Sequence, residues 1–441
     1  MKTKLASLRA GVSVTDVTPP VGYRLAGHAA RTAASNSVHD PLRLKVLTLN
    51  DGKTRVALIT SDLIGFGPES VARIRDRARK RLGLKPEQLM LTASHTHTGP
   101  CTYYPSSCMP SDHILPDYIR CLELKVVGGI IEAMNREERV TARWAEERIR
   151  IGAINRRKMT PAGLKFAPNP DGPVDDTVNL LRLDRADGRP LALVFRAACH
   201  PTTLAMPICS VSADYPGVSQ RLLEQLYPGA IALFIQGCCG DVRPGLYKDG
   251  EFLGGTHDDA DRMGRLLAAG VCRLMEEATS IRSTPLSVSL TFIQLPFDRT
   301  LFPTHHNLSR LSRQYTRENP EIAGRGWVLK WIRHWRKSLA AGQQPARFLP
   351  MGFQVLRIGD VTLGGLAAEV MAEYGDLVRQ ALGGKTIVAG YANGEIGYLP
   401  TAEAIQQGGY EAASFLYENY PAPFDPQLQK SVLRSIRNVV K

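Results

Sequence analysis

Two short histidine clusters are the residues of this chain best suited to chemistry, and each follows an apolar run typical of a strand. Residues 94–100 read Ser-His-Thr-His-Thr-Gly-Pro and contain His95 and His97. Side chains two residues apart share a face of an extended chain, so a bend there would let one histidine bind a metal while the other faces a substrate. Imidazole is a frequent zinc ligand. Taken alone, this pair is equally consistent with hydrogen-bonded loop histidines.

The second cluster, residues 199–203, contains His200 followed by Pro201. Proline restricts the residue before it to extended conformations, which limits the directions that the His200 side chain can take. A single histidine at a strand end is more often structural than a metal ligand. Two such clusters at matching strand ends nevertheless favour a metal site.

A third polar segment, residues 236–244, follows an apolar strand and contains Gly237 and Gly240. A glycine-rich turn after a buried strand brings backbone N–H groups close to a ligand, so we interpret it as an oxyanion or anion site, with a tight structural turn as the alternative. Cys238 and Cys239 leave a thiol nucleophile open. That chemistry would need a nearby base and a lowered pKa.

Apolar runs alternate along the chain with amphipathic helical patterns. We predict strands at 46–49, 55–60, 88–93, 141–154, 178–183, 191–198, 231–235, 355–358 and 361–363, and helices at 68–84, 118–134, 218–227, 258–278 and 370–382. The alternation and its hairpins predict an α/β fold, with a mixed β-sheet core flanked by helices. Functional residues of such sheets gather at the carboxyl ends of strands, where both histidine clusters fall. We expect one catalytic domain over residues 1–441.

The composition narrows the partners and the compartment. The chain of 441 residues has a net charge of +13, but no regular basic stripe or nucleic-acid-binding motif accompanies it, so we expect an anionic surface or substrate and no nucleic acid. The eight cysteines form neither a disulfide framework nor a zinc ribbon. No segment has the apolar length of a signal peptide or a membrane span, which predicts a soluble, cytoplasmic protein.

Taken in order along the chain, these motifs resemble those of the neutral/alkaline ceramidases. The resemblance is carried by residues 94–100, 200–201 and 240–244, and it extends to residues 11–18, 155–156, 397–401 and 409–414. Each motif is short, but their ordered combination is specific and spans nearly the whole chain. It implies a ceramidase-like catalytic domain.

The resemblance also implies a zinc site and the residues that act around it. One Zn²⁺ would be held by two imidazoles, a carboxylate and a phenol, namely His95, His200, Glu369 and Tyr398. Glu369 is matched by its position between a strand and a helix, with Glu373 as the alternative register. His97 and Arg156 would stabilise the oxyanion of the substrate. Such a metal lowers the pKa of a bound water from about 15.7 to about 7.

The chain departs from the family pattern within the third motif. The ceramidases carry a serine where this chain has Arg243, and a guanidinium suits a carboxylate or phosphate rather than nucleophilic attack. We assign catalytic roles to Asp241 and Arg243 and a substrate contact to Gly240. The chain also ends at Lys441, before the additional C-terminal β-domain expected of the family. Both departures favour an N-acyl compound in general over ceramide itself as the substrate.

The most unusual stretch, residues 327–337, places tryptophans at intervals of four on one helical face and basic residues on much of the rest. This pattern is typical of a helix at an anionic membrane interface. It is also typical of a surface helix that packs its aromatic face against the domain, which is the interpretation we favour. A third interpretation makes residues 298–350 an inserted lid, in which Trp331 and Trp335 contact the substrate.

The sequence therefore predicts a zinc-dependent hydrolase that uses metal-activated water to cleave the amide bond of an N-acyl, ceramide-like or other amphipathic substrate. Two alternatives remain open. One is a zinc esterase, lactonase or glycoconjugate hydrolase in which Arg243 binds an anionic group of the substrate. The other is a membrane-associated, metal-binding homologue without catalytic activity. The sequence makes no prediction of the oligomeric state.

Overall fold

The structure, a computed structural model, describes residues 7–28, 30–102, 115–319, 324 and 326–440. Among these residues the larger sheet has nine strands, in the order β12-β10-β9-β6-β1-β3-β4-β5 with β16 beside β6. Their bounds are β1 Arg9–Asp16, β3 Arg43–Asn50, β4 Arg55–Ser61, β5 Leu89–Ala93, β6 Glu138–Arg148, β9 Thr177–Arg185, β10 Pro190–Ala197, β12 Ile231–Gln236 and β16 Thr279–Ile281. The pairs β4/β5 and β10/β12 are parallel and the others antiparallel, so the predicted mixed sheet is confirmed.

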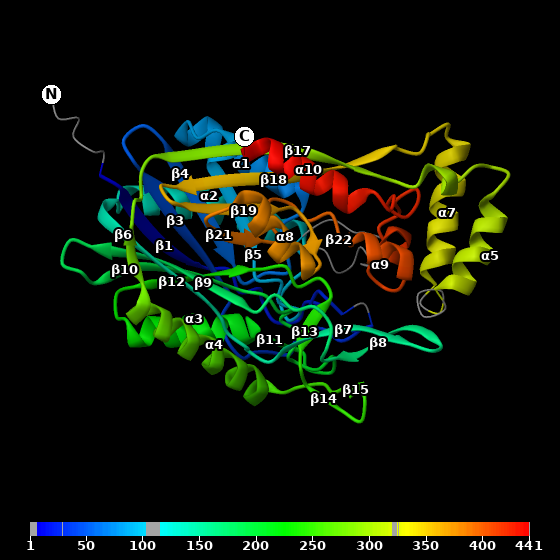
Figure 1. The fold of residues 1–441 in the computed structure, drawn as a ribbon, viewed down its shortest axis with the longest axis horizontal. Coiled ribbons are helices and arrows are strands. Elements are labelled where there is room, and N and C mark those ends of the chain that lie inside the picture. The colour runs from blue at the N-terminus through cyan, green and yellow to red at the C-terminus, as the bar shows by residue number, and fades with distance from the viewer. Residues whose placement is uncertain (1–6, 29, 103–114, 320–323, 325, 441) are drawn as a thin grey trace.

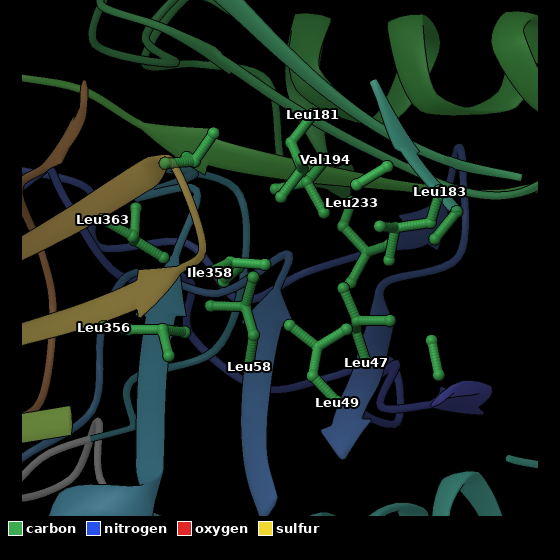
Figure 2. Close-up of a cluster of buried hydrophobic side chains, with 14 of the residues drawn as sticks. Leu47, Leu49, Leu58, Leu181, Leu183, Val194, Leu233, Leu356, Ile358 and Leu363 are labelled. Atoms are coloured by element: carbon green, nitrogen blue, oxygen red, sulfur yellow. The ribbon is translucent and has the colours of Figure 1, made fainter. Parts of the chain in front are cut away.

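A second sheet has the order β17-β18-β19-β21 and faces the first. Its strands are β17 Leu286–Pro296, β18 Phe348–Ile358, β19 Val361–Leu366 and β21 Lys385–Ala389. Figure 2 shows leucines of the large sheet, such as Leu58 and Leu233, in one cluster with Leu356 and Leu363 of the second sheet. Each such side chain contributes about 1.5–3 kcal/mol when fully buried, so this interface joins the two sheets into one core.

Helices cover the outer faces of both sheets (Figure 1). Helices α1 (Pro68–Leu82) and α2 (Pro116–Asn135) share a core with β3, β4 and β5. Helices α3 (Asp214–Leu226) and α4 (His257–Glu277) pack over β9, β10 and β12. Helices α8 (Glu373–Leu382) and α10 (Leu428–Val440) cover the second sheet. Among the described helices, none has the length and apolar character needed to cross a bilayer.

The large sheet curls so that its two end strands approach each other. The side-chain amide of Gln236, at the end of β12, donates 2.8 Å to the carbonyl of Ser94 just after β5. The ammonium of Lys45 on β3 donates 2.8 Å to the carbonyl of Ala232 on β12. The carboxyl ends of β5, β10 and β12 therefore meet at one place, where the backbone of Gly390, just after β21, also donates 3.1 Å to Gln236.

Short strands complete this end of the molecule. One small sheet contains β7 (Ala153–Thr160), β8 (Gly163–Asn169) and β13 (Val242–Pro244). A hairpin is formed by β14 (Tyr247–Lys248) and β15 (Glu251–Phe252). Two further pairs are β20 (Glu369–Val370) with β22 (Tyr398–Leu399) and β2 (Ser37–Val38) with β11 (Ser210–Val211).

The prediction of a single strand at 141–154 is wrong. The chain leaves the large sheet after Arg148 and turns at Gly152, whose φ of 88° is left-handed, before β7 begins.

The segment predicted as an insertion, residues 298–350, connects β17 and β18, which pair up to Pro296 and Phe348. It carries α5 (Leu308–Glu318) and α7 (Trp327–Ala340), which stand at one end of the molecule near α9 (Ala402–Gln407; Figure 1). The tryptophan face of α7 is buried: Trp331 is 0% and Trp335 4% exposed. Both indole N–H groups donate to the carbonyl of Tyr420, at 2.6 and 3.3 Å.

The burial shows which face of α7 is turned to solvent. The aromatic face packs against residues 410–420, and the face turned to solvent carries Leu329 and basic residues. The favoured interpretation, a surface helix with its aromatic face against the domain, describes the structure. Periodicity alone does not distinguish the two, because both need the same amphipathic pattern.

Candidate metal centre

Three loops at the carboxyl ends of strands bring two imidazoles and a carboxylate together. His95 follows β5, His200 follows β10, and Glu369 begins β20 shortly after β19. Oε2 of Glu369 lies 3.2 Å from Nε2 of His200 and 3.4 Å from Nε2 of His95. Nitrogen atoms of His95, His97 and His200 lie within 4.8 Å of one another. The carboxyl-end position predicted for the site is therefore where these side chains converge.

The backbone bends at His95, which has a left-handed φ of 68°. A non-glycine residue in this region is strained, and such strain is found mainly at functional sites. Its N–H donates 2.9 Å to the carbonyl of Leu63, which holds the bend in place. The bend separates the directions of His95 and His97, whose ring centroids lie 5.0 Å apart at an interplanar angle of 71°.

Backbone carbonyls orient both candidate histidine ligands. Nδ1 of His95 lies 2.6 Å from the carbonyl of Ile64, and Nδ1 of His200 lies 2.6 Å from that of Cys239. A proton on each Nδ1 satisfies these carbonyls and leaves the lone pair of each Nε2 directed toward Glu369. Histidines that bind metal are oriented in this way by a second hydrogen bond. Two imidazole nitrogens and a carboxylate oxygen also form a donor set that zinc accepts, so the residues fit this metal.

The electrostatics of the cluster favour a cation. Burial raises the pKa of Glu369, but the nearby His95 and His200 outweigh it and hold this pKa well below its usual value. Burial lowers the pKa of His95, but the attraction of Glu369 and Glu395 raises it to about 10. The pKa of His200 falls to about 4, mainly through burial. A deprotonated carboxylate thus faces one imidazole that gains a proton when no metal neutralises the acids.

His97 lies beside this cluster with both ring nitrogens buried and without a hydrogen-bond partner among the described residues. Its ring centroid is 5.0 Å from that of His95 and 5.7 Å from that of His200. Burial, with repulsion from His95, lowers its pKa well below the ordinary value, so the ring is neutral. A neutral, unpartnered imidazole is free to donate to a substrate or to bind a metal.

Tyr398 and Arg156 form a second polar group next to Glu369, because β22 pairs with β20 and places Tyr398 opposite Glu369. Nη2 of Arg156 donates 3.0 Å to the phenol oxygen of Tyr398, and Nε donates 2.9 Å to Glu411. Glu411 is also held by Arg157 at 2.6 Å. Arg156 is 5% exposed, so its position is fixed by these buried partners.

Gly240 and Asp241 of the 236–244 turn make hydrogen bonds to the segments that surround the metal centre. The N–H of Gly240 donates 2.7 Å to the carbonyl of Val370, so it is not free for an oxyanion, and a Cβ here would lie 2.9 Å from the carbonyl oxygen of Glu369. The carboxylate of Asp241 is 1% exposed and accepts from Ala372 and Asn155, both at 2.8 Å. The Gly240 N–H and the Asp241 carboxylate, predicted to contact and react with a substrate, thus both have partners within the protein.

The structure does not favour the alternative that Cys238 or Cys239 of this turn acts as a nucleophile. Cys238 and Cys239 are both 0% exposed. Burial raises the pKa of Cys238 to about 12 and that of Cys239 well above its usual value. A thiol that keeps its proton at neutral pH is a poor nucleophile.

Other residues named from the sequence lie farther from the cluster. Glu373, the alternative metal ligand, begins α8 and hydrogen-bonds Thr401 instead of facing the histidines. Trp331 and Trp335, predicted as substrate contacts, are buried in a cluster with residues 410–420. The sequence reasoning missed Glu395, which belongs with His95 and Glu369 to a second potential ligand group, and His28, whose ring lies 5.0 Å from that of His97.

The fold and the site together define a mixed α/β protein with a buried cluster of histidines and carboxylates whose ligand atoms are close enough together to hold a metal ion. The chain belongs to the neutral/alkaline non-lysosomal ceramidase family, because the model of the N-terminal part of that family matches residues 8–254. A neutral ceramidase of Mycobacterium tuberculosis is 22% identical over 93% of this chain and 74% of its own length.

Solved structures show the same fold. The neutral ceramidase of Pseudomonas aeruginosa superposes with a TM-score of 0.73 at 18% identity, covering 99% of this chain and 74% of that one. A structure described as a ceramidase complexed with C2 gives a TM-score of 0.75 at 17% identity, covering 99% and 75%. The predicted family and fold class are thus confirmed.

Proposed function

We propose that this protein is a zinc-dependent hydrolase that cleaves the amide bond of an N-acyl, ceramide-like substrate with water. Membership of the ceramidase family supports amide hydrolysis. The observation that carries the metal dependence is the convergence of His95, His200 and Glu369, with the carboxylate oxygen within 3.4 Å of both Nε2 atoms. We assign these three residues and Tyr398 to the metal. When bound, zinc supplies Lewis-acid activation of water and of the carbonyl oxygen.

The surrounding residues are suited to the other requirements of amide cleavage. As water adds to the amide carbon, negative charge develops on the carbonyl oxygen, and preorganised donors in a dry site stabilise it strongly. His97, neutral and without a partner among the described residues, is our first donor. Arg156 holds the phenol of Tyr398 and supplies positive charge beside it. The C–N bond then breaks, giving a carboxylic acid and an amine.

We also propose that residues 1–441 act as one catalytic domain and that 298–350 form a lid on it. Residues 317–319, at the end of α5, line a pocket of about 400 Å³ together with Arg156, Phe166 and Glu411. The insertion therefore reaches the wall that carries Arg156. Tyr398 itself shares a buried aromatic cluster with the tryptophans of α7, so a movement of the insertion would shift the position of Tyr398 at the metal centre.

Metal content and hydrolysis, measured on the same purified sample, test the proposal. We expect about one zinc per chain by elemental mass spectrometry, and hydrolysis of N-lauroylsphingosine that dipicolinate abolishes and zinc restores. Hydrolysis that is indifferent to metal removal would contradict it. Bound zinc without hydrolysis would support the inactive-homologue alternative. An O-acyl analogue of the same chain length, cleaved in preference to the amide, would support the esterase alternative.

A further inference from the structure

Arg243 lies beside the metal centre with its positive charge unpaired. It belongs to β13, directly after Val242, whose carbonyl accepts from the backbone N–H of His200 at 3.2 Å. Its guanidinium carbon stands 4.4 Å from the ring centroid of Phe252 and 5.9 Å from that of Phe166. Nε is buried without a hydrogen-bond partner, and no carboxylate among the described residues pairs with the group. The aromatic rings hold the guanidinium in place but do not neutralise it.

The neighbouring Arg156, unlike Arg243, has a carboxylate that neutralises its charge. Arg156 also stands over the ring of Phe166, at 5.2 Å, but its Nε donates to the carboxylate of Glu411. The two arginines thus share one aromatic neighbour, and only Arg156 has a carboxylate partner among the described residues. Burial and repulsion from Arg156 lower the pKa of Arg243 to about 10, which still leaves it charged at neutral pH.

Two further groups beside His97, Arg31 and His28, also carry buried polar atoms without partners among the described residues. Arg31 is 3% exposed, and its guanidinium donates to the carbonyls of Ala26, His97 and Met206, which leaves Nη2 unpartnered among the described residues. Nε2 of His28 is likewise buried and unpartnered. Burial lowers the pKa of His28 to about 3, and the positive charges of Arg31 and Arg243 contribute to this shift. Both arginines therefore oppose protonation of the same imidazole.

Buried donors without partners and an uncompensated charge are unfavourable unless a ligand satisfies them. We propose that Arg243 determines specificity for a substrate whose amine part carries an anionic group, a carboxylate or a phosphate, as in an N-acyl amino acid. The planar fork of a guanidinium binds either group through two parallel hydrogen bonds. This inference rests on the proposed amide hydrolysis, because it names the class of substrate that the same site takes.

Three lauroyl amides of equal chain length test the inference: N-lauroylglycine, N-lauroylphosphoethanolamine and the neutral N-lauroylethanolamine. The measured quantity is the ratio of kcat/KM for each anionic amide to that for the neutral one. We expect Arg243→Gln to lower this ratio about 10- to 100-fold, the range for loss of a charged hydrogen-bond partner. Arg243→Lys keeps the charge but loses the fork, and we expect an intermediate ratio. The relative fall for carboxylate and phosphate distinguishes the two anions.

Lys248 provides the matched control, since it lies exposed on β14 of the adjacent hairpin and Lys248→Gln removes the same charge. A ratio that is unchanged in Arg243→Gln, or that falls equally in Lys248→Gln, would overturn the inference. If neither these three amides nor N-lauroylsphingosine is hydrolysed, the proposed function fails, and calorimetry with N-lauroylglycine still tests Arg243. Equal Kd values for the wild type and Arg243→Gln would then overturn the inference by itself, whereas weaker binding by the variant would uphold it.

Discussion

The carboxylate of Glu369 lies 3.2 Å from Nε2 of His200, although 169 residues separate the two along the chain. The same oxygen lies 3.4 Å from Nε2 of His95, so one carboxylate joins the histidines of two separate loops. Two sheets that pack face to face bring the loops together, since His95 and His200 follow strands of the large sheet and Glu369 follows β19 of the second.

Glu369→Gln should therefore release the metal. An amide in place of the carboxylate removes the negative charge that attracts a cation and one ligand of the set. We expect the zinc content to fall from about one per chain to a small fraction of that, with the fold retained. Glu373→Gln is the matched control, because it removes the same charge four residues away at a side chain that hydrogen-bonds Thr401. Equal zinc content in both variants would remove Glu369 from the ligand set.

Gly27→Ala should impair catalysis without loss of zinc. The φ of Gly27 is +91°, and a Cβ there would lie 2.3 Å from Cγ of His97, so the imidazole would have to move. A displacement of about 1 Å can lower a rate about 100-fold, and we expect an effect of this size on kcat. Gly22→Ala is the control, because its φ is +100° but nothing lies within 4 Å of the added Cβ. Similar losses in both variants would indicate backbone strain instead of a role for His97.

Trp331→Ala should destabilise the protein. The indole is fully buried in an aromatic cluster with Tyr315 and Phe415, and its N–H donates to the carbonyl of Tyr420. Truncating a buried tryptophan costs about 3–5 kcal/mol, which denaturant unfolding measures. Leu329→Ala, on the exposed face of the same helix, should change the free energy of unfolding by less than about 0.5 kcal/mol. A Trp331→Ala variant as stable as the wild type would show that the indole does not pack as described.

The sequence contained enough to predict the two histidine loops but not everything that surrounds them. His95 and His200 stand directly after apolar strands, and strand ends converge in a layered α/β fold. Glu369 was placed from its position between strand and helix. His28 and Glu395 were missed because they lie outside the strand and helix patterns, where no periodicity marks a buried side chain.

Roles that depend on tertiary packing could not be predicted from the sequence either. The Gly240 turn has the composition of an anion-binding loop, but the N–H of Gly240 donates to the carbonyl of Val370, which belongs to β20 and lies 130 residues further along the chain. The tryptophans of α7 have the spacing of an interfacial helix, but a complementary aromatic surface at residues 410–420 covers them. In both cases the partner is distant in sequence, and local pattern carries no information about it.

Asp175→Asn should lower the stability more than any exposed charge substitution. Its carboxylate is 4% exposed and accepts from Arg196, which is 0% exposed, and from Arg379 at 2.8 Å. Removing one partner of a buried pair leaves the other charge uncompensated, which costs about 3–5 kcal/mol. Asp187→Asn removes an exposed partner of Arg189 and serves as the control, for which we expect no measurable change.

The effect of Asp175→Asn should also depend on pH, with a definite sign. Burial raises the pKa of Asp175, but Arg196 and Arg379 outweigh it and hold this pKa far below the value of about 3.9 for an unfolded chain. A lowered pKa in the folded state means that the carboxylate stabilises the fold fully above pH of about 4 and progressively less as the pH falls below it. The difference in the free energy of unfolding between wild type and variant should thus be constant from about pH 6 to pH 8 and shrink below about pH 4. A difference that grows toward acid would mean that the carboxylate is not ionised in the folded protein, and that the two arginines do not hold it as described.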